Sequence, residues 1–323
     1  MNEATIEQAG VSKRESYAPA RSRLPIKVLH DVGLVQSIVE RKRILPRHLH
    51  LRLTNRCNLQ CTSCISANRD KDQELSFDRV TSTLHTAHDL GCRAVTMSGG
   101  GEPTMHPDFH AIARKCAELR IRVGVTTNGT RLSQLPPSVA WCRISMSSRR
   151  RLTDIAGSLL HISQCPNTTW SFNYILHGCV NDLRDVVQFA NQHDFVQVRI
   201  VPDILNLSDF SANKAEAQAL LEGIDDKVIY QTWPQFSGGA RKCWVGLLKP
   251  TLAADGRWMP CCAVEFPERG ERRELDWPRS VSLASVIEQQ EYFDGSKCAI
   301  CYYDNYNRLL QSLLDEVDHK EWL

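Results

Sequence analysis

Apolar and polar residues alternate in several short stretches of the chain, and a helix-like pattern follows most of these stretches. "HLHLRLTN" (48–55) places Leu49, Leu51 and Leu53 at a period of two, which predicts a strand. Comparable patterns predict strands in 92–101, 121–129, 141–147, 169–176 and 195–202, and helices in 76–91, 107–120, 151–161 and 181–194. Six strands alternating with helices predict an α/β fold with a parallel sheet built from right-handed crossovers.

The regular alternation ends at Pro202, and a region of tryptophans, glycines and further cysteines follows. We therefore expect a domain boundary in the polar, helical stretch after it. The predicted organisation is a basic N-terminal extension (1–45), a core (46–205), a helical linker (206–235), a cysteine-rich domain (236–310) and a C-terminal helix or tail (311–323).

Composition narrows the class of protein. The chain has 323 residues and 42% hydrophobic content, which is enough for a substantial core. It contains no apolar run of about 18 residues, and its first residues are polar, so we expect neither a membrane span nor a secretion signal. A cytoplasmic protein is expected, and its 13 cysteines are then better interpreted as thiols or metal ligands than as disulfides.

Charge is nearly balanced overall, at +2, but it is uneven along the chain. Residues 1–56 hold 11 Lys/Arg against 5 Asp/Glu. Such a basic segment can steer an anionic substrate or contact a phosphate backbone, and it can equally form an ordinary solvated surface.

Three cysteines crowd the loop that follows the first predicted strand. "TNRCNLQCTSCISANRD" (54–70) holds Cys57, Cys61 and Cys64 in a C-x3-C-x2-C spacing. Structural zinc usually takes four ligands in two pairs, whereas three thiolates on a [4Fe–4S] cluster leave one iron open to a substrate or cofactor. A zinc loop that borrows a distant fourth ligand is the alternative.

A glycine triplet ends the second predicted strand, in "MSGGGEPTMHPDF" (97–109). Gly99, Gly100 and Gly101 allow the backbone to approach a ligand closely. Glu102 adds a carboxylate that can accept hydrogen bonds from an ammonium group. One strand–helix unit after the cysteine motif, this triplet is a strong signal for a bound cofactor.

Over residues 45–205 the sequence resembles the radical S-adenosylmethionine (radical SAM) superfamily. The cluster motif of the family falls on the three cysteines, and its "GGE" motif falls on Gly100, Gly101 and Glu102. The resemblance implies a partial (β/α)6 barrel and S-adenosyl-L-methionine bound at the open iron. It also implies that the glycine backbone and Glu102 hold the amino end of the cofactor. Ser63 stands where the family usually has an aromatic residue that packs on the adenine.

Further cofactor contacts are implied by position in the family's barrel. The end of the third strand would place Thr127 and Asn128 toward the pocket. On the fourth strand Ser145, or alternatively Ser147, matches a polar position near the ribose. Arg199 on the sixth strand could pair with the carboxylate of the cofactor, or be an ordinary interstrand arginine.

The C-terminal region holds a second set of cysteines, Cys243, Cys261, Cys298 and Cys301. Four thiolates in this spacing could hold zinc or a fully ligated [4Fe–4S] cluster, or they could be core thiols. The pattern resembles the twitch domain, the shortened form of the SPASM domain. This resemblance implies a small C-terminal cysteine-rich domain with one auxiliary [4Fe–4S] cluster, and therefore two clusters in the chain.

Two further thiols are candidate catalytic residues. Cys262 is adjacent to the proposed ligand Cys261 and could return a hydrogen atom to a substrate radical, which would make the enzyme an epimerase. It could instead pack as a small hydrophobe or replace its neighbour as a ligand. Cys179, after the fifth strand, is the weaker candidate for hydrogen donation.

The resemblance implies a radical SAM enzyme, an oxidoreductase or isomerase reduced by flavodoxin or ferredoxin. Such an enzyme abstracts a hydrogen atom from an unactivated C–H bond, and the substrate is epimerised, dehydrogenated or rearranged. The 45 residues before the first strand are too few for a peptide-leader domain, so a small polar or sugar-like substrate is expected. Alternatives are a nucleic-acid base or nucleotide, because of "SSRRR" (147–151), a ribosomal peptide, and a non-enzymatic iron–sulfur or zinc protein.

Overall fold

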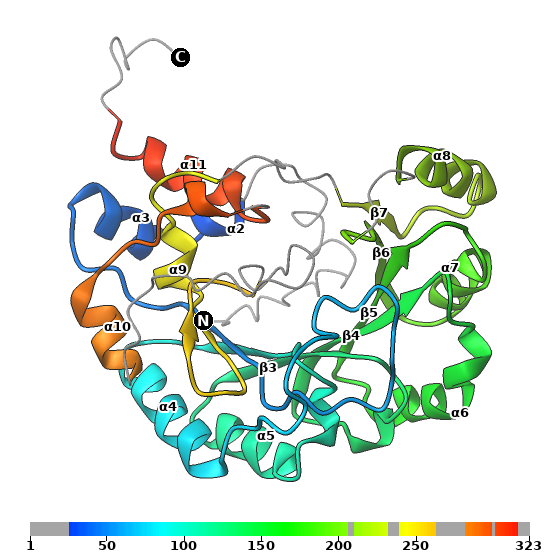
Figure 1. Ribbon diagram of the computed structural model, residues 1–323, viewed down its shortest axis with the longest axis horizontal. Coiled ribbons are helices and arrows are strands. Elements are labelled where there is room, and N and C mark those ends of the chain that lie inside the picture. The colour runs from blue at the N-terminus through cyan, green and yellow to red at the C-terminus, as the bar shows by residue number, and fades with distance from the viewer. Residues whose placement is uncertain (1–25, 206–209, 232–238, 263–281, 299–300, 316–323) are drawn as a thin grey trace, which may run out of the picture.

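The computed structural model of the protein describes residues 26–205, 210–231, 239–262, 282–298 and 301–315. Within these ranges nine strands form one sheet in the order β7-β6-β5-β4-β3-β2-β1-β8-β9. The sheet is curved, with helices α4 to α7 along its outer side, α10 beside α4, and α9 toward the inner side (Figure 1). The α/β class and the partial barrel are confirmed.

The strands are β1 (His48–Leu51), β2 (Ala94–Met97), β3 (Arg122–Thr127), β4 (Val139–Ser147), β5 (Thr169–Leu176), β6 (Phe195–Pro202), β7 (Val228–Tyr230), β8 (Thr251–Leu252) and β9 (Trp258–Met259). All neighbouring pairs are parallel except β8 with β9. The six predicted strands are confirmed as β1 to β6. Because these strands are parallel and consecutive, all their carboxyl ends meet at one edge, and the cysteine loop follows β1 at that edge.

The helices include α2 (Ile26–Leu29), α3 (Val32–Val39), α4 (Phe77–Asp89), α5 (Phe109–Glu118), α6 (Ala156–Leu159), α7 (Leu183–Gln192), α8 (Phe210–Leu220), α9 (Trp244–Leu248), α10 (Leu283–Gln289) and α11 (Asp304–Ser312). Helix α4 begins after Ser76, whose hydroxyl accepts a hydrogen bond from the Arg79 N–H at 3.2 Å. It is followed by Gly91 at a φ of 88°. The helix predicted over 151–161 is instead a series of short pieces: η4 (Leu152–Ile155), α6 and η5 (Leu160–Gln164).

Alternation along the strands separates an apolar outer face from a polar inner face. Leu49 and Leu51 of β1 are fully buried in the same core cluster as Val80 and Leu84 of α4. Successive side chains point to opposite faces of a strand, so His50, between these leucines, points inward. The same holds for β4 to β6. The inward face is therefore polar, and it is the face that the C-terminal segments approach.

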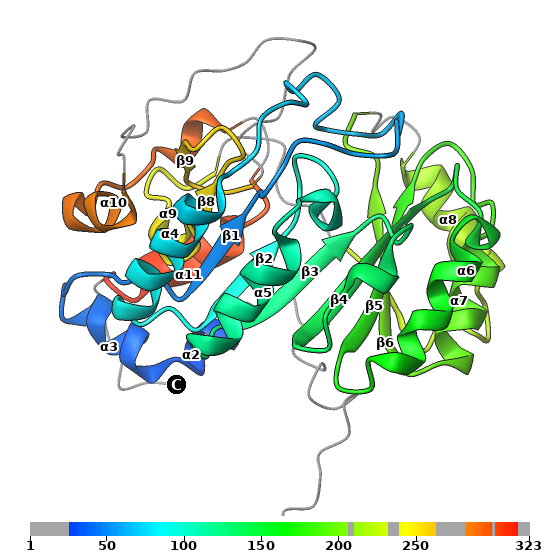
Figure 2. The same ribbon diagram turned by 90° about the horizontal axis from the view of Figure 1, so that it is seen from below.

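The C-terminal region extends the sheet instead of standing apart from it. Strand β8 pairs in parallel with β1, aligning Thr251 with His50, and β9 returns antiparallel to β8. Figure 2 shows α9 to α11 grouped around this end of the sheet. Two-residue strands are too short to produce a period-two signal, which is why the sequence did not predict them.

The segment expected as a helical linker holds α8 and also β7, which pairs in parallel with β6. Helices α2 and α3 lie within the expected N-terminal extension, of which residues 1–25 fall outside the described ranges. Residues 316–323 of the expected C-terminal tail also fall outside them. In the part of the chain that is described, no helix combines the length and the apolar character needed to cross a membrane.

Candidate active site

The three cysteines of the loop after β1 have the environment of thiolate ligands. Cys57 and Cys64 are half-buried and Cys61 is exposed. Backbone N–H groups two residues further on point at the first and third sulfur, with 3.5 Å from Leu59 N to Cys57 Sγ and 3.4 Å from Ser66 N to Cys64 Sγ. Burial raises the pKa of Cys61, and the charges of the other two cysteines raise it further. The three thiols are therefore electrostatic neighbours.

The donor set of this loop fits an iron–sulfur cluster. Thiolates are the ligands of such clusters, and N–H groups that donate to the sulfurs stabilise their negative charge. Among the described residues, no three His, Cys, Asp or Glu side chains are already arranged around a common metal position.

The glycine triplet packs directly on the backbone of the cysteine loop. Gly99 and Gly100 have φ angles of 51° and 90°, which favour glycine. Gly101 donates its N–H to the carbonyl of Thr54 at 2.8 Å. A Cβ at Gly101 would lie 1.9 Å from the carbonyl oxygen of Arg56, so only glycine fits. The glycine triplet therefore packs the end of β2 against the cysteine loop, apart from any contact that it makes with a cofactor.

Glu102 is a buried hydrogen-bond acceptor, with 2% exposure. Its Oε1 accepts from Thr104 N at 3.2 Å, Thr104 Oγ1 at 2.7 Å and Thr127 Oγ1 at 2.7 Å. Its Oε2 accepts from Asn128 N at 2.6 Å. A carboxylate offers about four lone-pair sites. The capacity of Oε1 is therefore used, and the expected contact with the amino group of the cofactor would fall to Oε2.

Asn128 connects the end of β3 to the cysteine loop. Its Nδ2 donates to Asn58 Oδ1 at 2.9 Å and lies 3.9 Å from Cys57 Sγ. Thr127, beside it, is buried at 2% exposure. The structure thus brings the predicted residues Glu102, Thr127 and Asn128 together with the first cysteine.

Arg150 is a residue of this site that the sequence analysis did not identify by itself. Its Nη1 donates to the carbonyls of Asn128 and Ser145, both at 2.8 Å. Burial lowers the pKa of Arg150, while the charges of Cys61 and Glu102 are among those that raise it. The sequence signal for Arg150 was its position just after β4, at the carboxyl edge of the sheet. Because three arginines follow one another there, the sequence did not indicate which of them belongs to the site.

The other predicted cofactor contacts lie on or near β4 and β6. Ser145 is half-buried and Ser147 is buried, both on one face of β4. Arg199 of β6 donates its Nε to Asn173 Oδ1 at 2.9 Å. Burial lowers the pKa of Arg199, and its electrostatic neighbours include Cys262. Arg150 is an electrostatic neighbour of Cys61, whereas the neighbours of Arg199 include Tyr303 and Cys262 of the C-terminal region.

Cys243 precedes α9 directly and is an electrostatic neighbour of Cys301. Burial raises the pKa of Cys243 to about 11, and the charge of Cys301 also raises it. Asn307 Nδ2 lies 3.9 Å from Cys243 Sγ and, with two backbone N–H groups, lowers that pKa. Cys261 lies just after β9, and Cys298 follows η6 (Gly295–Lys297). The hydrogen-bond donors around Cys243 favour its thiolate, whereas burial opposes it.

The two candidate hydrogen donors lie in different places. Cys262 is an electrostatic neighbour of Tyr303, and its carbonyl accepts from Arg52 Nη2 at 2.6 Å. The Cys179 thiol donates to the carbonyl of Ser148 at 3.6 Å, at the carboxyl edge of the sheet. Cys262 is therefore placed over the inward face, and Cys179 on its rim.

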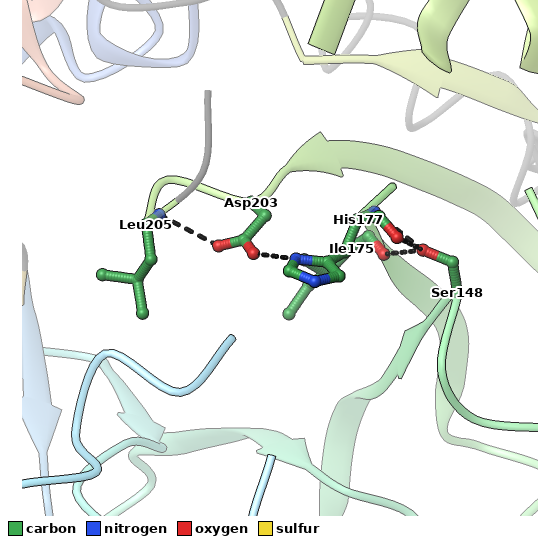
Figure 3. Close-up of polar contacts among 5 residues, drawn as sticks. All are labelled: Ser148, Ile175, His177, Asp203 and Leu205. Carbon is green, nitrogen blue, oxygen red and sulfur yellow. Dashed lines mark hydrogen bonds and ion pairs between the residues drawn. The ribbon is translucent and has the colours of Figure 1, made fainter. Parts of the chain in front are cut away.

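A histidine–aspartate pair also occupies the rim, and the sequence analysis missed it. His177 directly follows β5 and Asp203 directly follows β6, and a hydrogen bond joins His177 Nδ1 to Asp203 Oδ2 (Figure 3). Asp203 also accepts from Leu205 N at 2.9 Å, and Ser148 Oγ accepts from His177 N at 2.7 Å. The sequence signal for this pair was that both residues directly follow adjacent parallel strands. Polar side chains of binding sites in α/β proteins often lie at these carboxyl ends.

Residues 51–142 match the sequence profile described as "Radical SAM superfamily". One relative is a Pyrococcus furiosus "Tungsten-containing aldehyde ferredoxin oxidoreductase cofactor-modifying protein", 32% identical over 27% of this chain and 25% of its own length. Another is a Halobacterium salinarum "Probable GTP 3',8-cyclase", 38% identical over 24% of each chain. The match thus spans about a quarter of the length of these relatives.

A solved structure with a similar fold is Streptococcus suis SuiB bound to S-adenosylmethionine. Its TM-score is 0.55 with 16% identity, covering 76% of this chain and 67% of SuiB. At this identity the likeness concerns the fold.

Proposed function

We propose that the chain is a radical SAM enzyme, as the match of residues 51–142 suggests, and that it cleaves S-adenosylmethionine reductively and abstracts a hydrogen atom from its substrate. The observation that carries the proposal is the joining of the cysteine loop to the glycine triplet and Glu102. Gly101 and Glu102 both bond the loop backbone, to Thr54 and Arg56. A cofactor held by the loop would therefore meet the glycine backbone directly.

The residues of the loop have distinct proposed roles. Cys57, Cys61 and Cys64 hold a [4Fe–4S] cluster, which with S-adenosylmethionine supplies an electron and a carbon radical when bound. The glycine triplet and Glu102 hold the amino end of the cofactor. Arg150 offsets negative charge on the thiolates and on Glu102.

We further propose that Cys243, Cys261, Cys298 and Cys301 hold an auxiliary [4Fe–4S] cluster in a twitch-like domain. The supporting observation is the set of N–H donors around Cys243, which lowers the cost of a thiolate there. Alanine at both Cys298 and Cys301 should remove about four of about eight irons, because two thiolates cannot hold a cubane. Unchanged iron content would contradict this ligand set.

For the substrate we propose a small polar molecule, epimerised, dehydrogenated or rearranged by an oxidoreductase or isomerase. A nucleotide, as the names of the GTP 3',8-cyclase relatives suggest, is the second candidate, and a peptide is the third. We also propose a cytoplasmic location and reduction by flavodoxin or ferredoxin.

The decisive experiment replaces Cys57, Cys61 and Cys64 together by alanine. The anaerobically reconstituted variant should lose about four irons and form no 5′-deoxyadenosine, because the open cluster has no other ligands. Cys116→Ala is the matched control, since this buried thiol belongs to the core cluster. Cofactor cleavage by the triple variant at the wild-type rate would overturn the proposed function.

The fate of the substrate radical is tested with Cys262→Ala. If Cys262 returns the hydrogen atom, the variant should keep both clusters and form 5′-deoxyadenosine, but it should not incorporate solvent deuterium into the product. Wild-type product at the wild-type rate would instead make Cys262 a packing residue and favour dehydrogenation or rearrangement.

A further inference from the structure

His177 and Asp203 lie on the inward face of the sheet, at its carboxyl edge. Ile175 of β5 pairs with Val201 of β6, and the next residues on the same side of the two chains are His177 and Asp203. Asp203 N donates to the last carbonyl of β5 at 3.1 Å, so the pairing of the chains continues to this point. The two side chains therefore point toward the interior of the barrel.

This histidine–aspartate pair adjoins the candidate active site. Ser147 of β4, a predicted cofactor contact, pairs with the residue that precedes His177 by one inward position on β5. The Ser148 hydroxyl accepts a hydrogen bond from His177 N at 2.7 Å. Arg150, two residues further along the chain, is an electrostatic neighbour of Cys61. The pair therefore shares the edge of the sheet at which the cysteine loop begins.

Asp203 fixes the imidazole of His177 in one orientation. Its side chain is only 1% exposed, and its Oδ2 forms a hydrogen bond with Nδ1 of the ring (Figure 3). The other carboxylate oxygen, Oδ1, accepts from Leu205 N at 2.9 Å. Because an ionised carboxylate only accepts hydrogen bonds, Nδ1 carries the hydrogen. In the neutral ring Nε2 then keeps its lone pair.

The second ring nitrogen of His177, Nε2, is available for a ligand. It has no hydrogen-bond partner among the described residues, and the side chain is 12% exposed. His106 differs, because its Nε2 bonds to the Leu75 carbonyl at 2.8 Å and its Nδ1 accepts from Asp108 N at 3.1 Å. A buried carboxylate behind an imidazole whose second nitrogen is open is the arrangement of a histidine general base.

We propose that His177 is a base of the active site, which accepts at Nε2 the proton of a hydroxyl group of the substrate. The O–H bond breaks, an N–H bond forms, and the electron pair stays on the oxygen. Asp203 stabilises the resulting imidazolium. A neutral nitrogen suits a neutral hydroxyl donor, whereas an ammonium group bonds more strongly to a carboxylate. The inference rests on the proposed function and narrows its substrate class to molecules with a hydroxyl group near the reacting carbon.

Acylation by diethyl pyrocarbonate tests whether Nε2 is unprotonated and accessible. Mass spectrometry of the reconstituted full-length protein measures the rate for each histidine. His177 should react at least about tenfold faster than His106, whose ring nitrogens are both occupied. Asp203→Asn should slow the reaction at His177, because the amide no longer fixes the hydrogen at Nδ1, and Asp203→Glu should restore part of the rate. Long-range 1H–15N spectra of protein with labelled histidine should show hydrogen at Nδ1 and none at Nε2.

Two ligands separate a role toward the substrate from a role toward the cofactor. myo-Inositol, a neutral ring of hydroxyl groups, is the substrate probe. At tens of millimolar it should slow acylation of His177 and leave the exposed His85 unaffected. Saturating S-adenosylmethionine should leave the rate at His177 unchanged.

The proposal is wrong if Nε2 carries hydrogen or if His177 reacts no faster than His106. It is also wrong if myo-inositol gives no protection, or if S-adenosylmethionine protects His177. Because acylation involves no turnover, loss of cofactor cleavage with these results intact would contradict the proposed function alone.

Discussion

Replacing Gly101 by alanine should detach the cysteine loop from the end of β2. The added Cβ would lie 1.9 Å from the carbonyl oxygen of Arg56, whereas real Cβ atoms essentially never come closer than 3.0 Å. The backbone must therefore move by at least 1.1 Å, the difference between these two distances. The neighbouring atom belongs to the main chain, so a side-chain rotation cannot relieve the overlap.

This movement would break the hydrogen bonds from Gly101 N to Thr54 O and from Glu102 N to Arg56 O, both 2.8 Å long. Each contributes about 1 kcal/mol, so Gly101→Ala should lower the free energy of unfolding by about 2 kcal/mol. Urea unfolding of the anaerobic protein measures this, and calorimetry should show weaker binding of S-adenosylmethionine.

Gly157→Ala is the control for this experiment. No atom lies within 4 Å of a Cβ at Gly157, which is part of α6. Alanine there should leave stability unchanged or raise it by up to about 1 kcal/mol, because alanine favours the helix. If Gly101→Ala matches Gly157→Ala in both stability and cofactor affinity, the loop does not depend on this contact.

Glu102→Gln should lower the free energy of unfolding by about 1 to 3 kcal/mol and weaken cofactor binding at unchanged iron content. The reason is that the amide NH2 group of Gln would face at least one N–H or O–H donor, such as the Asn128 N–H. Unaltered cofactor affinity in calorimetry would contradict this prediction. Burial lowers the pKa of His48 from 6.5 to about 3. Between these two pH values His48 is therefore protonated in the unfolded chain and neutral in the folded chain. Stability should therefore fall as the pH drops from 6.5 toward 4, by up to about 1.4 kcal/mol per unit, and urea titrations of His48→Gln should show a shallower fall. Asp203→Asn weakens the hydrogen bond between this side chain and His177 Nδ1 and should lower the urea midpoint, corresponding to about 1 to 2 kcal/mol; an unchanged midpoint would show that the contact is not stabilising.

The sequence predicted the six central strands because each has a period-two pattern long enough to detect. Strand β5 at Thr169–Leu176 and β6 at Phe195–Pro202 were predicted to the residue. Strand β8, with only Thr251 and Leu252, carries no periodicity, and its place is decided by pairing with distant β1. Short elements of this kind depend on tertiary contacts that local patterns do not contain.

The same contrast holds for the candidate site. The cysteine spacing and the glycine triplet are local motifs, and they predicted which segments meet. Arg150, His177 and Asp203 carry no motif, and only the alignment of strand ends brings them to one edge. Nor could the sequence indicate that the Glu102 carboxylate accepts most of its hydrogen bonds from N–H and hydroxyl groups of the protein itself.

The pairing of β8 with β1 determines where the chain can be cut. Backbone bonds run from Arg47 N to Leu248 O, from His50 N to Pro250 O and from Arg52 N to Leu252 O, at 2.9, 3.0 and 2.9 Å. A truncation before β8 would leave β1 as a bare edge strand, and such edges recruit strands from other molecules. A shortened expression product that ends after β7 should therefore aggregate even if its own cysteine loop is intact. Because β1 and β8 are some 200 residues apart in the sequence, we expect them to pair late in folding. Until then β1 is an unpaired edge strand that can aggregate, and chaperones would protect it at this stage.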